Sequence, residues 1–145
     1  FLPCFYRLEG NYGRADEYEQ LYHEGKISAD AHAVSHQLYR HGPLPVLELR
    51  HALGWTSKRQ NQRFKRALLE LQLRLLIVHW GTQAETGAWE SGVYQLTPRA
   101  FPQQVKAAAK LSAEEARRRI AAQYRTLNPV ATAADFKRLF CWPPE

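Results

Sequence analysis

The sequence predicts a mainly α-helical fold that carries one small β-hairpin, an α+β arrangement. Apolar residues recur at helical spacing in three segments between residues 30 and 73. Two short apolar runs, 75–80 and 92–97, follow these segments and are typical of strands. With 145 residues, 45% of them hydrophobic, the chain is long enough to bury a core without disulfides or metals.

The N-terminal residues predict a docking segment. Residues 1–14 mix aromatic side chains with proline and glycine, which favours an irregular or short-stranded segment that packs on something else. Residues 15–24 are expected to form a short helix. We therefore expect residues 1–29 to be an N-terminal docking segment that contains one short helix.

Two helices should follow, separated by a short extended piece. Asp30 is a suitable N-cap for a helix that runs to about residue 40. Leu44 precedes a proline, which disfavours helix at that position and favours an extended backbone. Pro45 suits the first turn of the next helix, expected over about 46–53.

The third helix is expected over residues 58–73, with Ser57 as its N-cap. Its apolar positions follow the i, i+3, i+4, i+7 spacing of an amphipathic helix: Phe64, Ala67, Leu68, Leu71 and Leu75. The strands 75–80 and 92–97 should pair across a loop, 81–91, and lay their apolar face on the three helices.

The order helix, extended piece, helix, turn, helix, hairpin is that of a winged helix-turn-helix, so we expect a winged-helix domain over residues 30–97. Residues 98–111 are expected to be a linker. Ser112 and Glu115 have the spacing of a capping box for a helix to about residue 127.

A short internal similarity follows. It relates residues 45–50 to 132–137 and Trp55 to Trp142 at one offset (132 − 45 = 87 and 142 − 55 = 87). This offset indicates that residues 112–145 are the start of a second, truncated winged-helix unit, and chance similarity is the alternative. Both ends of the sequence indicate a fragment of a longer protein.

Basic residues predict a nucleic-acid surface on the third helix. The net charge is +6 and the pI is about 9.5. With the apolar face inward, Lys58, Arg59, Gln62 and Arg66 should point outward, flanked by Arg63 and Lys65. We expect Arg59 and Gln62 to read base edges of double-stranded DNA. The expected phosphate contacts are Lys58, Arg63, Lys65 and Arg66.

A solvated charged helix face is the general alternative to a DNA-binding surface here. The loop of the hairpin carries Glu85 and Glu90 but no lysine or arginine, whereas a wing that follows phosphates should be basic. Trp89 in that loop can stack on DNA or pack within the protein. A second basic group is expected to be a salt-bridged helix surface: Arg117, Arg118, Arg119 and Arg125.

The sequence predicts neither a metal site nor a cofactor. His32 and His36 have helical i, i+4 spacing, but no third ligand follows at a usual distance. No nucleophile motif and no phosphate-binding or dinucleotide-binding glycine motif is found. The sequence has no membrane-spanning apolar stretch and no secretory signal, and its two cysteines lie at opposite ends, so we expect a cytoplasmic protein.

Several runs together resemble the AlkZ-like DNA glycosylase family. They begin with His41-Gly42-Pro43-Leu44, Leu53-Gly54-Trp55 and Val93-Tyr94-Gln95-Leu96, and continue with Ser112-Ala113-Glu114-Glu115-Ala116 and Ala131-Thr132-Ala133-Ala134-Asp135-Phe136. The resemblance covers about residues 30–145. It implies a bacterial protein of tandem winged helices around a DNA channel, which excises alkylated bases, including those in interstrand crosslinks.

The family's catalytic signature, Gln-apolar-Gln or Gln-apolar-Asp, has no match in this sequence. Gln60-Asn61-Gln62 has a polar centre, and Gln72-Leu73-Arg74 lacks the final residue. No catalytic residue is therefore assigned. The resemblance implies a DNA-binding region of a repair glycosylase-like protein, and the alternatives are a winged-helix transcriptional regulator or a winged helix used for protein contacts.

Overall fold

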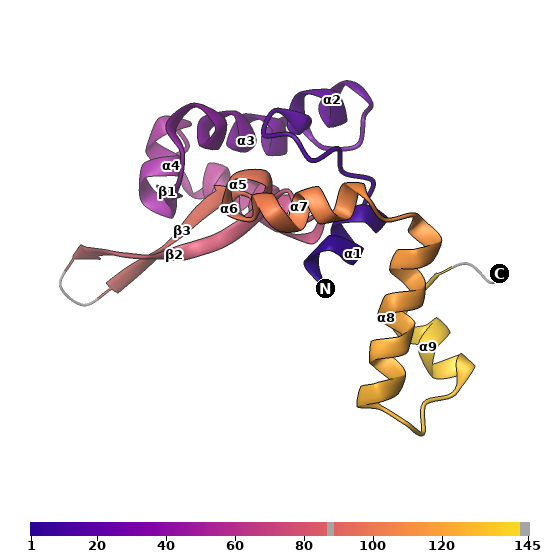
Figure 1. The fold of residues 1–145 in the computed structure, drawn as a ribbon. Helices are drawn as coiled ribbons and strands as arrows, with labels where there is room; N and C mark the ends of the chain where they lie inside the picture. Colours follow the sequence, from indigo (N-terminus) through magenta and orange to yellow (C-terminus); the bar gives the residue numbers. More distant parts are fainter. Residues whose placement is uncertain (87–88, 143–145) are drawn as a thin grey trace.

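The computed structural model describes residues 1–86 and 89–142 (Figure 1). It confirms a mainly helical α+β fold with one small antiparallel sheet. The helices are α1 (Leu2–Leu8), α2 (Glu17–His23), α3 (Ala29–His41), α4 (Val46–Ala52), α5 (Lys58–Leu73), α6 (Thr97–Ala100), α7 (Pro102–Ala109), α8 (Ala113–Leu127) and α9 (Ala133–Phe140). The strands are β1 (Leu44–Pro45), β2 (Ile77–Thr86) and β3 (Trp89–Leu96).

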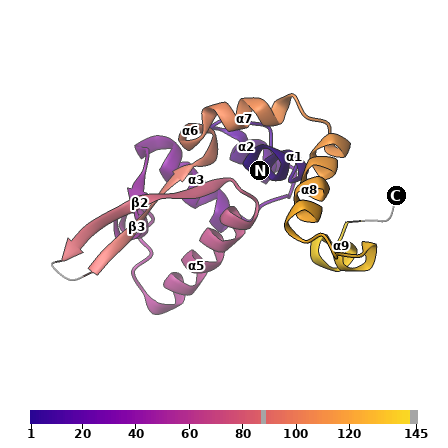
Figure 2. The ribbon, with the colours of Figure 1, turned by 60° about the horizontal axis from the view of Figure 1, so that its bottom comes forward.

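The main core lies between α2, α3, α4, α5 and the base of the sheet. Helices α3 and α5 contact one another directly, and the start of the hairpin closes the open side of the helical group (Figure 2). The buried side chains of this core include Leu21, Val34, Leu38, Leu49, Phe64, Leu71, Leu76, Ile77 and Leu96. The apolar stripe predicted for 58–73 therefore points inward, except that Leu75 lies beyond the helix and is only partly buried.

The sheet has the order β1-β3-β2, and both pairings are antiparallel. Leu44 pairs with Tyr94, so the predicted extended piece is a short strand. The expectation of a loop over 81–91 is wrong for the described residues, because β2 continues to Thr86 and β3 starts at Trp89. The pairing satisfies the backbone groups that face from one strand to the other, even though the side chains are polar or small.

Three local predictions need correction at helix starts. Helix α3 begins two residues earlier than expected, because the Ser28 hydroxyl accepts a hydrogen bond from the Ala31 N–H and Asp30 lies in the first turn. Pro45 is the N-cap of α4 and a strand residue, not a first-turn residue. Ser112 caps α8 as predicted, but Glu115 forms ion pairs with Arg118 and Arg119 instead of completing a capping box.

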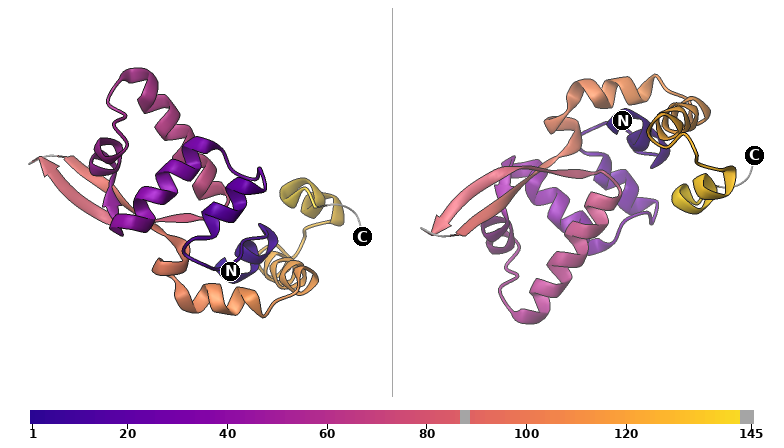
Figure 3. Two further views of the ribbon diagram at one scale, coloured as in Figure 1. Left: turned by 90° about the horizontal axis from the view of Figure 1, so that it is seen from above. Right: turned by 90° about the horizontal axis from the view of Figure 1, so that it is seen from below.

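The N-terminal segment and the segment after the hairpin are more helical than predicted. Residues 1–14, expected to be irregular or short-stranded, contain α1, which packs on α7 and α8 (Figure 3). Residues 98–111, expected to be a linker, lie mostly in α6 and α7. Both α1 and α7 carry a proline in their first turn, where a missing N–H costs no helical hydrogen bond.

Helices α8 and α9 form a separate arm on the far side of α1 (Figure 1). A small core connects this arm to α1 through Cys4, Leu111, Ala116 and Ile120. Thr132 caps α9 in a capping box with Asp135, and no residue of α9 is buried. Among the described residues, no helix combines the length and the apolar character that crossing a lipid bilayer requires.

Candidate nucleic-acid interface

Helix α5 begins with a fully formed capping box. The Ser57 hydroxyl accepts a hydrogen bond from the Gln60 N–H at 3.3 Å, and the Gln60 side-chain oxygen accepts one from the Ser57 N–H at 3.0 Å. The bounds Lys58–Leu73 are those that the sequence predicts. Because its side chain is engaged in the cap, Gln60 is not available as the first residue of a Gln-apolar-Gln signature.

The six predicted site residues all lie on the exposed side of α5. Phe64, Ala67, Leu68 and Leu71 are buried on the opposite side of the helix. In Figure 2, α5 lies at one margin of the molecule and α7 at the other. The residues on the exposed side are Lys58, Arg59, Gln62, Arg63, Lys65 and Arg66.

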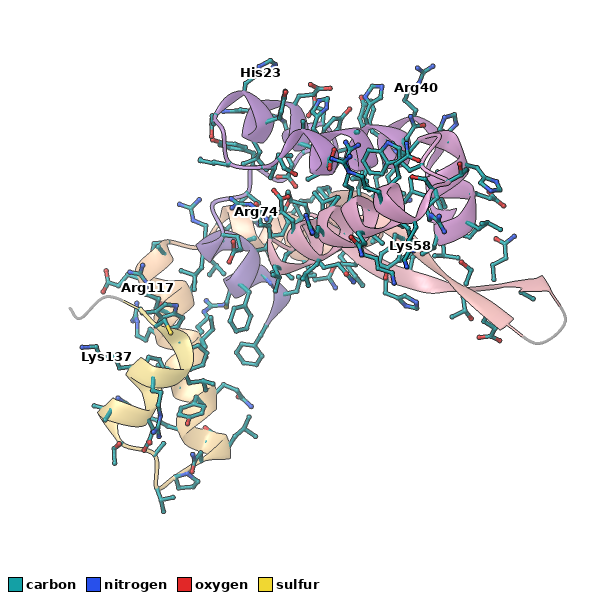
Figure 4. The ribbon with its side chains drawn as sticks, turned by 180° about the vertical axis from the view of Figure 1, so that it is seen from behind. His23, Arg40, Lys58, Arg74, Arg117 and Lys137 are labelled. Atoms are coloured by element: carbon teal, nitrogen blue, oxygen red, sulfur yellow. The ribbon has the colours of Figure 1, made fainter. Side chains whose placement is uncertain are left out.

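Most of these cations have no partner in the part of the chain that the structure describes. Among the described residues, no ion pair and no side-chain hydrogen bond involves Lys58, Arg59, Lys65 or Arg66. Figure 4 shows Lys58 at the start of α5, on the surface of the molecule. Unpaired cations near the N-terminus of a helix, where backbone N–H groups also point outward, form a favourable surface for phosphate.

Arg63 differs from the other five residues. Its Nε and Nη2 donate to the two carboxylate oxygens of Asp30, at 3.0 and 2.6 Å. Its guanidinium also lies 5.0 Å from the centre of the Trp55 ring. The Arg63 hydrogen bonds lower the pKa of Asp30, so the carboxylate stays ionised and keeps its partner.

The outward stripe of α5 changes character along its length. Leu69 and Leu73 lie on the stripe that contains Arg59, Gln62 and Arg66, and these leucines are 56% and 68% exposed. The cationic surface is therefore limited to the first turns of the helix. This apolar continuation was not predicted, although the i, i+7 spacing from Gln62 to Leu69 and from Arg66 to Leu73 indicates it.

The hairpin offers aromatic groups and the exposed His79, and its sequence, residues 77–96, contains no lysine or arginine. Trp80, at a bulge between His79 and Gly81, is 50% exposed and packs edge-on against Phe101. The tryptophan predicted to be available in this region was Trp89, whose side chain lies outside the described residues, as does that of Glu85. Glu90 is exposed.

The second basic group on α8 is partly neutralised, as expected. Glu115 forms ion pairs with both Arg118 and Arg119. Arg117 lies over the Trp142 ring at 6.0 Å. Arg125 is exposed at the far end of the helix.

The histidine pair on α3 is held by polar contacts. His32 Nε2 lies 2.9 Å from a Glu19 carboxylate oxygen, and His36 Nδ1 lies 2.8 Å from the Tyr18 hydroxyl. In the part of the chain that the structure describes, no group of three or more His, Cys, Asp or Glu residues is arranged to hold a metal ion. The two histidines therefore connect α3 to α2, and this role explains their i, i+4 spacing on one side of α3.

No curated protein and no solved structure matches the chain. A family model described as "AlkZ related" matches residues 1–141. This match starts at the first residue and includes α1 and α2, which lie before the residues that carry the resemblance. Because it spans nearly the whole sequence, the chain belongs to the AlkZ-related family.

Proposed function

We propose that this chain is the DNA-binding winged-helix region of a repair glycosylase-like protein that acts on alkylated or crosslinked DNA. Family membership supports a role in DNA repair. The order α3, β1, α4, α5, β2, β3 supports a winged-helix unit over residues 30–97. In this proposal residues 1–29 dock on that unit and residues 98–111 link it to the α8–α9 arm.

The α8–α9 arm is proposed to start a second unit of the same kind. The first residue of α9, Ala133, lies 87 positions after Val46, the first residue of α4 (133 − 46 = 87). A helix start at this position agrees with the internal similarity of the sequence. Helix α8 would then correspond to α3, and residues 112–145 to the first part of the repeat.

The observation that carries the proposal is the set of exposed, unpaired cations on the first turns of α5. A helix of this kind fits a major groove about 12 Å wide. In such a complex Arg59 and Gln62 would face base edges. Lys58, Lys65 and Arg66 would contact phosphates on either side.

Duplex binding by the Arg59→Ala, Arg66→Ala double variant tests this assignment. We expect weaker binding and a shallower dependence on salt, because each lost phosphate contact lowers the slope of log K against log salt by about 0.9. The matched control is Lys106→Ala with Lys110→Ala, which removes the same charge from α7 and its C-cap on the other margin of the molecule. Equal affinity and slope for the wild type and the α5 variant would remove α5 as the interface.

The choice of DNA separates repair from regulation. A repair protein should bind an alkylated or distorted duplex more tightly than the same unmodified duplex. A transcriptional regulator should instead select one operator sequence whether or not the DNA is damaged. Base release from alkylated DNA by the full-length protein would establish glycosylase activity, to which no residue of this chain is assigned.

Protein contact is the second candidate function, and the composition of the hairpin favours it. Residues 77–97 contain no lysine or arginine, and Trp80 is half exposed at the hairpin base. A wing without cations gains little from phosphate. If neither duplex binds and the α5 variant behaves like the wild type, a protein partner on this surface becomes the better assignment.

A further inference from the structure

The start of α3 is fastened to α5 at two points. Asp30, in the first turn of α3, forms the two-point contact with Arg63. Ser28, the N-cap of the same helix, donates from its N–H and its hydroxyl to the two carboxylate oxygens of Glu70, at 2.8 and 2.6 Å. Each of these two contacts uses both oxygens of one carboxylate, and a two-point contact fixes the relative orientation of the two side chains as well as their distance.

These fastenings constrain how α5 sits on the body of the protein. Arg63 and Glu70 are seven residues apart, about two helical turns, and both lie on the side of α5 that faces the start of α3. Two contacts separated along a helix fix its rotation about its own axis as well as its axial position. The rotation decides which way Arg59, Gln62 and Arg66 point.

The Arg63 guanidinium is held by two different kinds of contact. Asp30 accepts hydrogen bonds from Nε and Nη2, and the guanidinium carbon lies over the Trp55 ring. Trp55 in turn packs edge-on against the buried Phe64 at 6.5 Å between ring centres. Two of the five N–H donors of this guanidinium are held by Asp30, so its position and plane are fixed by contacts within the protein.

We propose that Arg63 is a positioning residue of the interface and not a phosphate contact. Together with Asp30 and the Ser28–Glu70 pair, it sets the orientation in which α5 presents Arg59, Gln62 and Arg66. This inference rests on the proposed function and revises one residue of the expected set. In this proposal the unpaired cations of α5 contact DNA, and Arg63 holds the helix in the orientation that lets them do so.

Replacement of Asp30 by asparagine distinguishes a phosphate contact from a positioning residue, because the two roles of Arg63 predict opposite changes in DNA affinity. The change raises the net charge by one and weakens the contact with Arg63, because the amide offers one neutral oxygen in place of two charged ones. If Arg63 is a phosphate contact restrained by Asp30, duplex binding tightens and the salt slope steepens. If Arg63 is a positioning residue, binding weakens, by about three- to tenfold, and the slope stays that of the wild type.

A charge swap tests the same pair without changing the net charge. The double variant Asp30→Arg, Arg63→Asp keeps an ion pair in this place but removes the cation from position 63. Positioning predicts that the swap recovers affinity relative to Arg63→Gln. An affinity equal to or below that of Arg63→Gln would show that the cation itself is needed, and would overturn the proposal.

The experiment uses fluorescence anisotropy of a short labelled duplex across a salt series, with thermal unfolding of every variant followed by circular dichroism. The matched control for charge is Glu114→Gln on α8, a carboxylate outside the described ion pairs, which should leave affinity nearly unchanged. The Arg59→Ala, Arg66→Ala variant is titrated in parallel. If it binds like the wild type, the proposed interface fails; if it weakens binding while Asp30→Asn tightens it, only the role of Arg63 fails.

Discussion

Glu17 should be one of the residues on which the stability of the fold depends most. Its side chain is almost completely buried, with 3% exposure, at the start of α2. The carboxylate accepts a hydrogen bond from the Tyr6 hydroxyl of α1. It also accepts from the backbone N–H groups of Tyr12 and Gly13, at 2.7 and 2.9 Å. One side chain thus connects α1, the following loop and α2.

The cost of removing Glu17 follows from these three donors. A buried donor left without a partner costs about 1–3 kcal/mol. Tyr6 is 1% exposed and bears the full penalty, whereas Tyr12 lies at the surface and its N–H can recruit water. We therefore expect Glu17→Ala to lower the free energy of unfolding by about 2–5 kcal/mol, and Tyr6→Phe by about 1–2 kcal/mol.

Glu17 should also leave a signature in the pH dependence. Burial raises the pKa of Glu17, against the opposing effect of its hydrogen bonds. A group whose pKa is raised on folding contributes stability that is complete below its unfolded value of 4.5 and is lost as pH rises through the folded value. The free energy of unfolding of the wild type minus that of Glu17→Gln should therefore increase as the pH falls through this window.

Urea unfolding followed by circular dichroism at a series of pH values measures both effects. Carboxyl groups with a lowered pKa, such as those of Glu19 and Asp30, titrate in both proteins and cancel in the difference. Glu9→Ala, at an exposed glutamate after α1, is the control for loss of a carboxylate. A cost of less than about 1 kcal/mol for Glu17→Ala, or a difference that shrinks in acid, would refute this reasoning.

Two further stability predictions use the same assay. Gly13 has φ +81°, and an added Cβ would lie 3.0 Å from a Val105 methyl, so Gly13→Ala should lower the free energy of unfolding by about 2–3 kcal/mol. Gly10 has φ +73° and lies in open space, so Gly10→Ala should cost about 1 kcal/mol. Equal costs would exclude the contact with Val105 as the cause. Arg99 donates from one nitrogen, Nη1, to two carbonyl oxygens in the last turn of α3, and its guanidinium lies over the Tyr39 ring. Arg99→Ala should therefore cost about 1 kcal/mol, whereas Arg99→Lys should cost less, because an ammonium can also donate to both oxygens. Equal costs for the two variants would contradict this.

Local signals predicted the parts of the fold that local forces determine. Helix 58–73 has a capping residue, a capping partner and a continuous apolar stripe, and its bounds agree with the structure. That stripe places Lys58 and Arg59 on the outer side of the helix. The helix over 102–109 also carried a local signal, a proline at the start and apolar Val105 and Ala108 at helical spacing, which the linker interpretation overlooked.

The remaining features depend on contacts between distant residues. Residues 81–86 have the composition of a loop, and only the opposite strand makes them a strand. Ser28 and Asp30 are both suitable caps; in the structure Ser28 caps α3 and Asp30 is engaged by Arg63, 33 residues later in the sequence. Because of this pairing Arg63 differs from the other cations of α5, which have no described partner. The charge pattern of α5 alone cannot predict this difference, since the partner lies on α3.

The strand order has a consequence for how the molecule behaves in concentrated solution. Strand β1 covers only the base of β3, and among the described residues β2 has no neighbour on its outer side. Alternate residues of this ten-residue strand turn their amide and carbonyl groups outward, where a further strand can add, and the strand contains no lysine that would oppose such pairing. Register shifts between His79 and Gly81 and between Ala84 and Thr86 interrupt this edge, so self-association through the hairpin should use the regular segment between them, residues 81–84.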